Sequence, residues 1–303
     1  MAGLGLAAVA FILATRWSPV LAGHPAYPLT LALVAAASAV VALSAVLARG
    51  ESSGRRAALS RRRLVAGVVV SILAVTVLGV LVWLRPLGAT SRALDALADG
   101  RGIDVTQSAT RITLRPMAAG SPVGVVFYPG AKVDSRAYAA ILRPLAEAGH
   151  LVVIVKVPFG IAFAAPDAAG DVIDSERGVR RWVVAGHSLG GTVAARYAGG
   201  GHRGVGGLLL WASYPASSIR DRTDLAVTSV SATNDGLATP EDIAASRADL
   251  PPRTRFVAVE GAVHADFGDY GAQSGDGTRT IPHDQAQRRI VAASLDMLER
   301  LDP

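Results

Sequence analysis

The sequence predicts an α/β domain with a doubly wound, mostly parallel sheet, preceded by two or three transmembrane helices. Two long, uncharged and mostly apolar runs lie in the first 84 residues, and from residue 103 short apolar runs alternate with helical segments. Such alternation is typical of parallel α/β sheets. We therefore expect a transmembrane segment at 1–85, a linker at 86–102 and an α/β domain at 103–303.

The apolar runs at 29–48 and 64–84 are each long enough to cross a bilayer. A helix rises about 1.5 Å per residue, so about 20 residues cover the roughly 30 Å of hydrocarbon. Globular helices seldom stay apolar on every face for about five turns, which favours spans over core helices. The run at 2–14 is either a third span, reaching to about residue 17, or part of a cleaved signal. No positive charge precedes Arg16, which favours a span.

Positive charge is concentrated in this membrane segment. Residues 1–85 hold eight arginines and one glutamate, a net of +7, whereas residues 86–303 hold 22 basic and 23 acidic residues, a net of −1. The basic balance therefore does not indicate nucleic-acid binding. The loop between the two long runs carries six of these arginines: Arg49, Arg55, Arg56, Arg61, Arg62 and Arg63.

Arginine enrichment in a short loop marks the cytoplasmic side of a membrane, and the same residues can contact anionic lipid head groups. We therefore expect a multi-pass protein of the cell membrane whose α/β domain lies on the extracytoplasmic side. The chain has no cysteine, so disulfides give no information about the compartment.

The α/β domain begins with a hairpin, predicted at 104–116 by alternating β-branched residues. The apolar run 123–130 ends at Pro-Gly and is typical of a central strand buried on both faces. A helix is predicted at 134–150, with Asp134 as its N-cap, and the last helix at 283–301. Further strands are predicted at 151–158, 181–188, 205–215, 225–235 and 254–264.

Ser188 is the candidate nucleophile. It lies in Gly186-His187-Ser188-Leu189-Gly190, a G-x-S-x-G turn that raises a serine hydroxyl above the end of a strand where the next helix starts. The pattern alone is weak in a chain with 32 glycines, where it can be a turn without chemistry. A strand-like segment before it and a helix-like segment after it match the context that the motif requires.

A serine hydroxyl needs a base to accept its proton and a carboxylate to orient that base. In the order serine, acid, histidine, the later members follow later strands. His264 follows the last predicted strand and is the preferred base. The alternatives are His150, which precedes the serine, His202, which lies in a glycine-rich turn, and His283, which begins the final helix.

Asp235 is the preferred acid because it ends the strand before the one that leads to His264. Asp266 and Asp269 follow the histidine and are expected to line a loop. Glu241 and Asp242 lie in the first turns of the next helix, where acidic residues are common. Asp235 itself has an alternative role, because Asn-Asp-Gly is favourable turn chemistry.

Two donors are needed for the oxyanion that forms when the serine attacks. The N–H of Leu189, directly after the nucleophile, is the first candidate. The second comes from the loop after the 123–130 strand, where Gly130 and Ala131 both present amides without bulky side chains. The sequence leaves the choice between these two open.

Four segments together resemble the α/β-hydrolase superfamily, and within it bacterial dienelactone-hydrolase-like serine esterases. They are FYPGAKVD at 127–134, AGHSLGG at 185–191, SATNDGLATPEDI at 231–243 and VEGAVHADFGDYG at 259–271. The resemblance covers about residues 103–301 and implies Ser188, Asp235 and His264 as the triad. Dienelactone hydrolases themselves use a cysteine, which this chain lacks, so their substrate is not implied.

The segment after the sixth predicted strand is too short for the helical cap that many α/β hydrolases insert there, so we expect an open site. The sequence thus predicts a membrane-anchored serine hydrolase that cleaves small carboxylic esters through an acyl-enzyme, without metal or organic cofactor. Thioesterase, amidase and acyltransferase activities use the same residues. An inactive hydrolase fold that serves as a surface binding module is the non-enzymatic alternative.

Overall fold

The computed structural model describes residues 2–51, 61–100, 102–118 and 120–302. Contacts divide the chain into two compact units, Met1–Pro86 and Leu87–Pro303. Arg55 and Arg56, in the loop predicted to be cytoplasmic, lie outside the described residues. The two units are described separately below.

The first unit consists of helices α1 (Ala2–Ala22), α2 (Ala26–Glu51) and α3 (Arg61–Trp83). Each contains a stretch long and apolar enough to cross a membrane. Helix α1 extends beyond the predicted end of its apolar run. Its backbone leaves helical geometry at Arg16 (φ −144°, ψ 32°), three residues before Pro19. The proline ring conflicts with the carbonyl four residues earlier and removes a helical hydrogen bond, which accounts for the kink.

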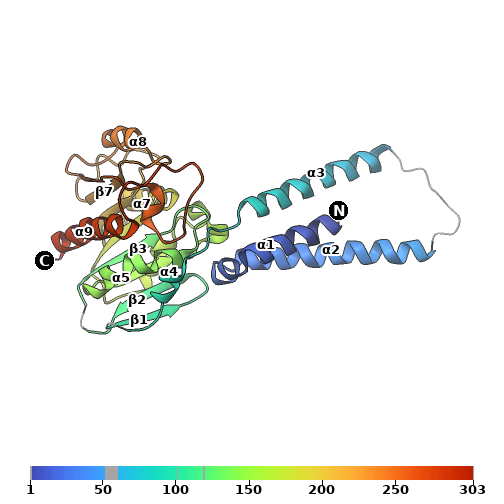
Figure 1. Cartoon of the computed structure of the whole chain (residues 1–303), viewed down its shortest axis with the longest axis horizontal. Coiled ribbons are helices and arrows are strands. Elements are labelled where there is room, and N and C mark those ends of the chain that lie inside the picture. Colours follow the sequence, from blue (N-terminus) through green and yellow to red (C-terminus); the bar gives the residue numbers. More distant parts are fainter. Residues whose placement is uncertain (1, 52–60, 101, 119, 303) are drawn as a thin grey trace. The chain divides into compact units, whose positions relative to one another are not determined.

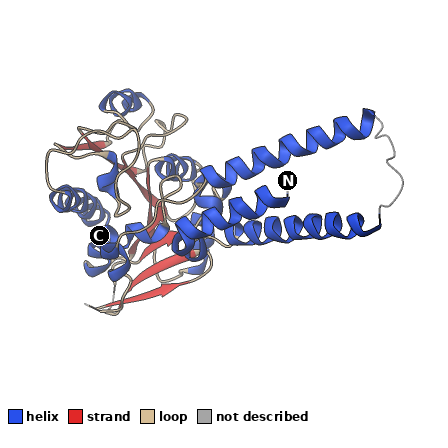
Figure 2. Cartoon of the chain, turned by 45° about the vertical axis from the view of Figure 1, so that its right-hand side comes forward, coloured by secondary structure: helices blue, strands red, loops and turns tan. Residues whose placement is uncertain are grey.

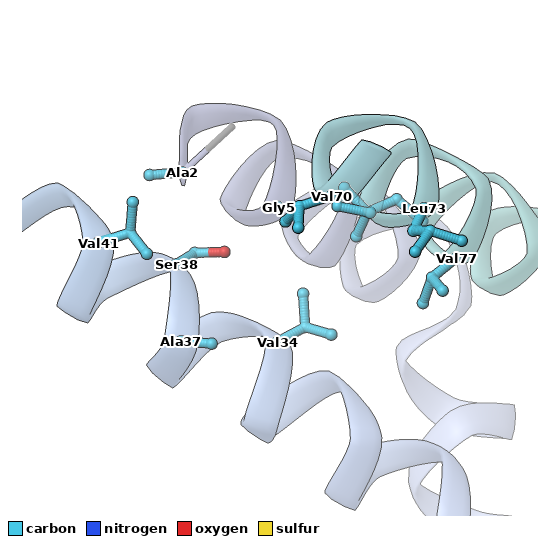
Figure 3. Close-up of a pocket in the computed structure, with 11 residues that line it drawn as sticks. Ala2, Gly5, Val34, Ala37, Ser38, Val41, Val70, Leu73 and Val77 are labelled. Carbon is cyan, nitrogen blue, oxygen red and sulfur yellow. The ribbon is translucent and has the colours of Figure 1, made fainter. Parts of the chain in front are cut away.

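Helices α1 and α2 run side by side (Figure 1) and pack through small residues. A Cβ atom added at Gly5 would lie 2.1 Å from Oγ of Ser38, so the Ser38 side chain would have to move. An apolar pocket of about 420 Å³ lies between α1, α2 and α3. Figure 3 shows the residues that line it. Among its lining residues Ser38 alone has a polar side chain.

The second unit contains an eight-stranded sheet in the order β1-β2-β4-β3-β5-β6-β7-β8. Strands β3 to β8 are parallel, and β1 and β2 form an antiparallel hairpin whose second strand pairs antiparallel with β4. The mostly parallel sheet and the hairpin predicted from the sequence are confirmed. The strand bounds are β1 Ile103–Gln107, β2 Arg111–Pro116, β3 Val123–Tyr128, β4 Val152–Val155, β5 Arg181–His187, β6 Val205–Trp211, β7 Ala226–Ala232 and β8 Arg255–Val259.

Helices cover both faces of this sheet (Figure 2). Successive strand residues point to opposite faces, and β3 shows the consequence, because Phe127 packs with α5 and α9 whereas Val126 packs with α6 and α7. The final helix has the bounds predicted for it. The helices are α4 Ser91–Asp95, α5 Ala139–Glu147, α6 Ala168–Ser175, α7 Leu189–Gly199, α8 Pro240–Ala245 and α9 His283–Leu301.

The segment predicted as a linker packs against the core of the second unit. Leu87 pairs with Val133, directly after the β3 loop, and Ala93 of α4 is completely buried. Leu97 lies against the same core. Ala93 in α4 and Leu97 in the turn directly after it thus form a short apolar stripe. Because the surrounding residues are polar or small, this short apolar stripe is not evident in the sequence.

The segment between β6 and β7 carries no helical cap. Strand β6 ends at Trp211 and β7 begins at Ala226, and no helix lies between them. The predicted absence of a large cap is therefore confirmed. The loops that follow β3, β5, β7 and β8 all leave the same edge of the sheet, since these strands are parallel.

Candidate active site

Ser188 lies in a strained turn between β5 and α7. Its φ of 52° and ψ of −127° lie in a region that residues other than glycine rarely adopt. The turn is held from both sides, because the Ser188 N–H donates to the carbonyl of Trp211 and its own carbonyl accepts from the Ser213 hydroxyl at 2.6 Å. The fold therefore maintains a backbone conformation that presents the Ser188 side chain at the sheet edge.

The glycines on either side of Ser188 are required by close backbone contacts. A Cβ atom at Gly186 would lie 2.4 Å from the Gly190 carbonyl carbon, and one at Gly190 would lie 2.3 Å from the Tyr128 carbonyl oxygen. Backbone atoms cannot move aside as a flexible side chain can. The spacing of the motif thus follows from the packing of this turn against the end of β3.

Asp235 and His264 come together on neighbouring loops after β7 and β8. The His264 Nδ1 lies 2.8 Å from Oδ2 of Asp235, and both side chains are completely buried. The other Asp235 oxygen accepts the N–H groups of Leu237 and Ala238, each at 2.8 Å. An ionised carboxylate is an acceptor only, so the proton is on Nδ1 of His264. Its Nε2 is consequently the free acceptor of the ring.

The Nε2 atom of His264 is buried and makes no hydrogen bond within the part of the chain that the structure describes. Ser188 Oγ forms none with it either; such bonds often tighten only when substrate is bound. The arrangement can accept a proton at Nε2 while Asp235 stabilises the resulting imidazolium.

The amides predicted as oxyanion donors differ in their hydrogen bonds. Leu189 is the first residue of α7, so its N–H has no acceptor inside the helix. In the β3 loop the Gly130 N–H donates to the Tyr138 hydroxyl at 2.8 Å, whereas the Ala131 N–H has no partner among the described residues. The two amides that the sequence leaves as alternatives therefore differ in that Gly130 already has a hydrogen-bond acceptor.

Tyr138 is a residue near the site that the sequence analysis missed. Its hydroxyl lies 2.9 Å from Nδ1 of His187, in addition to accepting from Gly130. Burial and the neighbouring His264 hold the pKa of His187 well below its ordinary value, so the ring is neutral and accepts the tyrosine proton. No motif marks Tyr138, because its contact with residue 130 depends on how the following helical turn packs.

More than half of the sequence matches a known family. Residues 124–288, more than half of the chain, match the alpha/beta hydrolase family. The chain belongs to this family. No curated protein matches it in sequence.

Several solved structures resemble this hydrolase. A thermostable esterase from Pseudomonas putida is 17% identical, with a TM-score of 0.48 over 70% of this chain and 88% of the esterase. A putative dienelactone hydrolase from Klebsiella pneumoniae is 14% identical, with a TM-score of 0.44 over 63% and 96% of the two chains. A serine hydrolase without a lid from Xanthomonas campestris is 14% identical, with a TM-score of 0.47 over 68% and 97%.

The alternative histidines of the hydrolase are engaged elsewhere. His150 bonds the Val123 carbonyl, and His202 stacks on Tyr197 with ring centroids 4.0 Å apart. His283 lies between two carboxylates other than Asp235. None of the three is hydrogen-bonded to Asp235 among the described residues.

The alternative acids also have other partners. Asp242 forms a capping box with Thr239 at the start of α8, as expected for an acidic residue in a first turn. Asp266 and Asp269 both bond His283 rather than His264. Glu241 lies in the first turn of α8. Among the described acidic side chains, Asp235 alone is hydrogen-bonded to the His264 ring.

His283 joins the loop after His264 to helix α9. Its Nδ1 lies 2.7 Å from Asp266 and its Nε2 lies 3.0 Å from Asp269. Arg279 contacts Asp266 at 2.6 Å, and Arg92 lies 3.8 Å from Asp269. Burial raises the pKa of Asp266, but hydrogen bonds from His283 and Arg279 outweigh this effect and lower it overall. The cluster carries a charged imidazole between two buried carboxylates.

The stability of the hydrolase is expected to fall as the pH rises from about 6.5 to about 9. Hydrogen bonds to Asp266 and Asp269 raise the pKa of His283 from 6.5 to about 9. A folded-state pKa above the unfolded one stabilises the fold fully below pH 6.5, and this contribution is lost as the pH passes 9. Because the ring is 28% exposed, screening limits the loss to about 1–2 kcal/mol.

Thermal unfolding of the detergent-solubilised chain between pH 6 and 9.5 measures this effect. His283→Gln is expected to lower the transition temperature at pH 6 and to flatten its dependence across the range. His202→Gln is the matched control, since it removes a histidine without carboxylate partners. An unchanged pH dependence in His283→Gln would contradict the assignment.

Proposed function

We propose that the protein is a membrane-anchored serine hydrolase that cleaves carboxylic esters. The observation that carries the proposal is the buried hydrogen bond between Asp235 and His264. The centroid of the His264 ring lies 4.5 Å from that of His187, which directly precedes the serine held in a strained turn. A buried carboxylate that orients an imidazole, with the opposite ring nitrogen free, is the arrangement by which a serine hydroxyl is activated.

In the proposed reaction Ser188 Oγ attacks the ester carbonyl and His264 Nε2 accepts its proton. The N–H groups of Leu189 and Ala131 stabilise the oxyanion, where loss of one donor costs about 3–4 kcal/mol of barrier. His264 returns the proton to the leaving alcohol, and the acyl group remains on Ser188. A water molecule activated by His264 then releases the acid and restores the enzyme.

Fluorophosphonate labelling tests the nucleophile. These probes phosphonylate activated serines, so the wild-type chain is expected to be labelled and Ser188→Ala is not. Ser218→Ala, which removes an exposed serine from the β6–β7 loop, should react like the wild type. Equal labelling of wild type and Ser188→Ala would contradict the proposal and favour the binding-module alternative.

A comparison of thioester, amide and ester substrates at equal acyl length distinguishes the enzymatic alternatives.

We also propose that α1, α2 and α3 anchor the hydrolase in the cell membrane, with the catalytic unit outside the cytoplasm. The support is their length and apolar composition together with the arginine-rich loop between the second and third helices.

Because the chain has no cysteine, introduced thiols report topology without background. A cysteine at Ser274 should react with an impermeant maleimide on intact cells, and one at Ser53, outside the described residues, should not. The reverse pattern would place the catalytic unit in the cytoplasm.

A further inference from the structure

A segment beyond the proposed triad, residues 275–277, lies directly on the loop that carries Asp235. A Cβ atom at Gly277 would lie 1.8 Å from the Asn234 carbonyl oxygen, and one at Gly236 would lie 2.6 Å from the Gly275 carbonyl oxygen. The two backbones therefore touch, and glycine is needed on both sides. The contact brings Asp276 between the Asp235 loop and the His264 loop.

The carboxylate of Asp276 accepts hydrogen bonds from both of these loops. Its Oδ1 accepts the N–H of His264 at 3.1 Å and that of Gly236, the residue after Asp235, at 3.3 Å. Its Oδ2 accepts the N–H of Ala265 at 2.9 Å. One side chain thus joins the backbone of the proposed base to the backbone next to the proposed acid.

These N–H groups have few other acceptors. His264 and Ala265 begin the 3-10 turn His264–Phe267, and the first N–H groups of a turn have no partner within it. Hydrogen bonds to an ionised carboxylate are roughly twice as strong as neutral ones. Asp235 and His264 otherwise belong to separate loops, after β7 and β8, so a shared anchor fixes their distance.

We propose that Asp276 is a positioning residue that holds the Asp235 and His264 loops in register. Its carboxylate accepts backbone N–H groups and acts through the hydrogen bond between Asp235 and His264. This inference rests on the proposed function. The positioning role explains why the side chain of Asp276, 12 residues after His264 in the sequence, bonds the His264 backbone.

Asp276→Ala and Asp276→Asn in the full-length chain test the proposal, with p-nitrophenyl acetate as the probe substrate. Active sites are counted by fluorophosphonate labelling, so that turnover is expressed per competent site. Because small displacements of catalytic groups can cost about 100-fold in rate, Asp276→Ala should lower kcat per site by about that factor with KM unchanged. Asp276→Asn retains one acceptor oxygen and should lose only about tenfold.

Asp242→Ala is the matched control, because it removes a carboxylate that also accepts a backbone N–H, that of Thr239, but is not bonded to the N–H groups that Asp276 holds. It should leave kcat and KM unchanged. A residue that only supports the fold would reduce the number of labelled sites and leave kcat per site at the wild-type value. That result for Asp276→Ala would overturn the proposal.

A double-mutant cycle with Asp235→Asn tests the route by which Asp276 acts. If Asp276 serves the contact between Asp235 and His264, its removal should cost little once that contact is already lost. The rate of fluorophosphonate labelling is the readout. An undiminished 100-fold cost in the Asp235→Asn background would contradict the positioning role. Equal turnover by wild type and Ser188→Ala would instead contradict the proposed function itself.

Discussion

Replacing Ser188 by alanine is expected to lower kcat for ester hydrolysis about 10⁶-fold, because the residues of such a unit act together. Alanine removes the atom that forms the acyl bond, and no described side chain takes its place at the end of β5. His264→Ala should cost about as much, since the hydroxyl then has no base. The measurement is kcat for p-nitrophenyl acetate with the full-length chain in detergent.

The double variant Ser188→Ala/His264→Ala should be no slower than either single variant, because each loss alone removes the same step. Ser218→Ala is the control and should retain wild-type kcat. Residual activity above about one thousandth of wild type would mean, in Ser188→Ala, that another group attacks the ester and, in His264→Ala, that another base activates Ser188. If the fold-losses in kcat of the two single variants multiply in the double variant, Ser188 and His264 act independently.

Replacing Asp235 by asparagine is expected to lower kcat about 10⁴-fold, as a reversed imidazole tautomer does in serine hydrolases. The structure explains why the tautomer must change here. Oδ1 of Asp235 accepts the N–H groups of Leu237 and Ala238, so an amide oxygen would remain at that position. The amide NH₂ would then face Nδ1 of His264, which must become the acceptor. The proton moves to Nε2, where it prevents proton transfer from Ser188.

The matched variant Asp242→Asn changes a carboxylate on the same segment that caps α8 instead, and kcat should not change. Thermal unfolding of both variants shows whether a loss of kcat comes from the changed tautomer of His264 or from a destabilised fold. Retention of more than a tenth of wild-type kcat by Asp235→Asn would contradict the role of Asp235 as the acid.

The elements of the α/β unit could be predicted from local patterns. The hairpin at 104–116, the buried strand at 123–130 and the final helix at 283–301 all correspond to observed elements. Each has a strong period or a fully apolar run, and each ends at a turn or cap residue. The order of Ser188, Asp235 and His264 along the chain can likewise be read from the sequence. Parallel strands bring the loops that follow them to one edge of the sheet.

The packing of the predicted linker against the core could not be predicted from local sequence patterns. Ala93 and Leu97 form a stripe too short to stand out in a polar segment, and Leu87 pairs with Val133, which is distant in sequence. The continuation of α1 past Arg16 also went beyond its predicted end, because Pro19 bends the helix there and does not end it.

By itself the sequence determined the fold class, the two long apolar helices and the residue types at the ends of the strands, because all of these depend on local period and composition. It left the run at 2–14 open between a third span and a cleaved signal. Only the tertiary structure shows that the Tyr138 hydroxyl accepts the amide of Gly130, a residue close in sequence but on a different element. Only the tertiary structure brought Asp276 to the backbone of both His264 and Gly236. Hydrogen bonds between separate loops depend on distances in space, and no spacing along the chain encodes them.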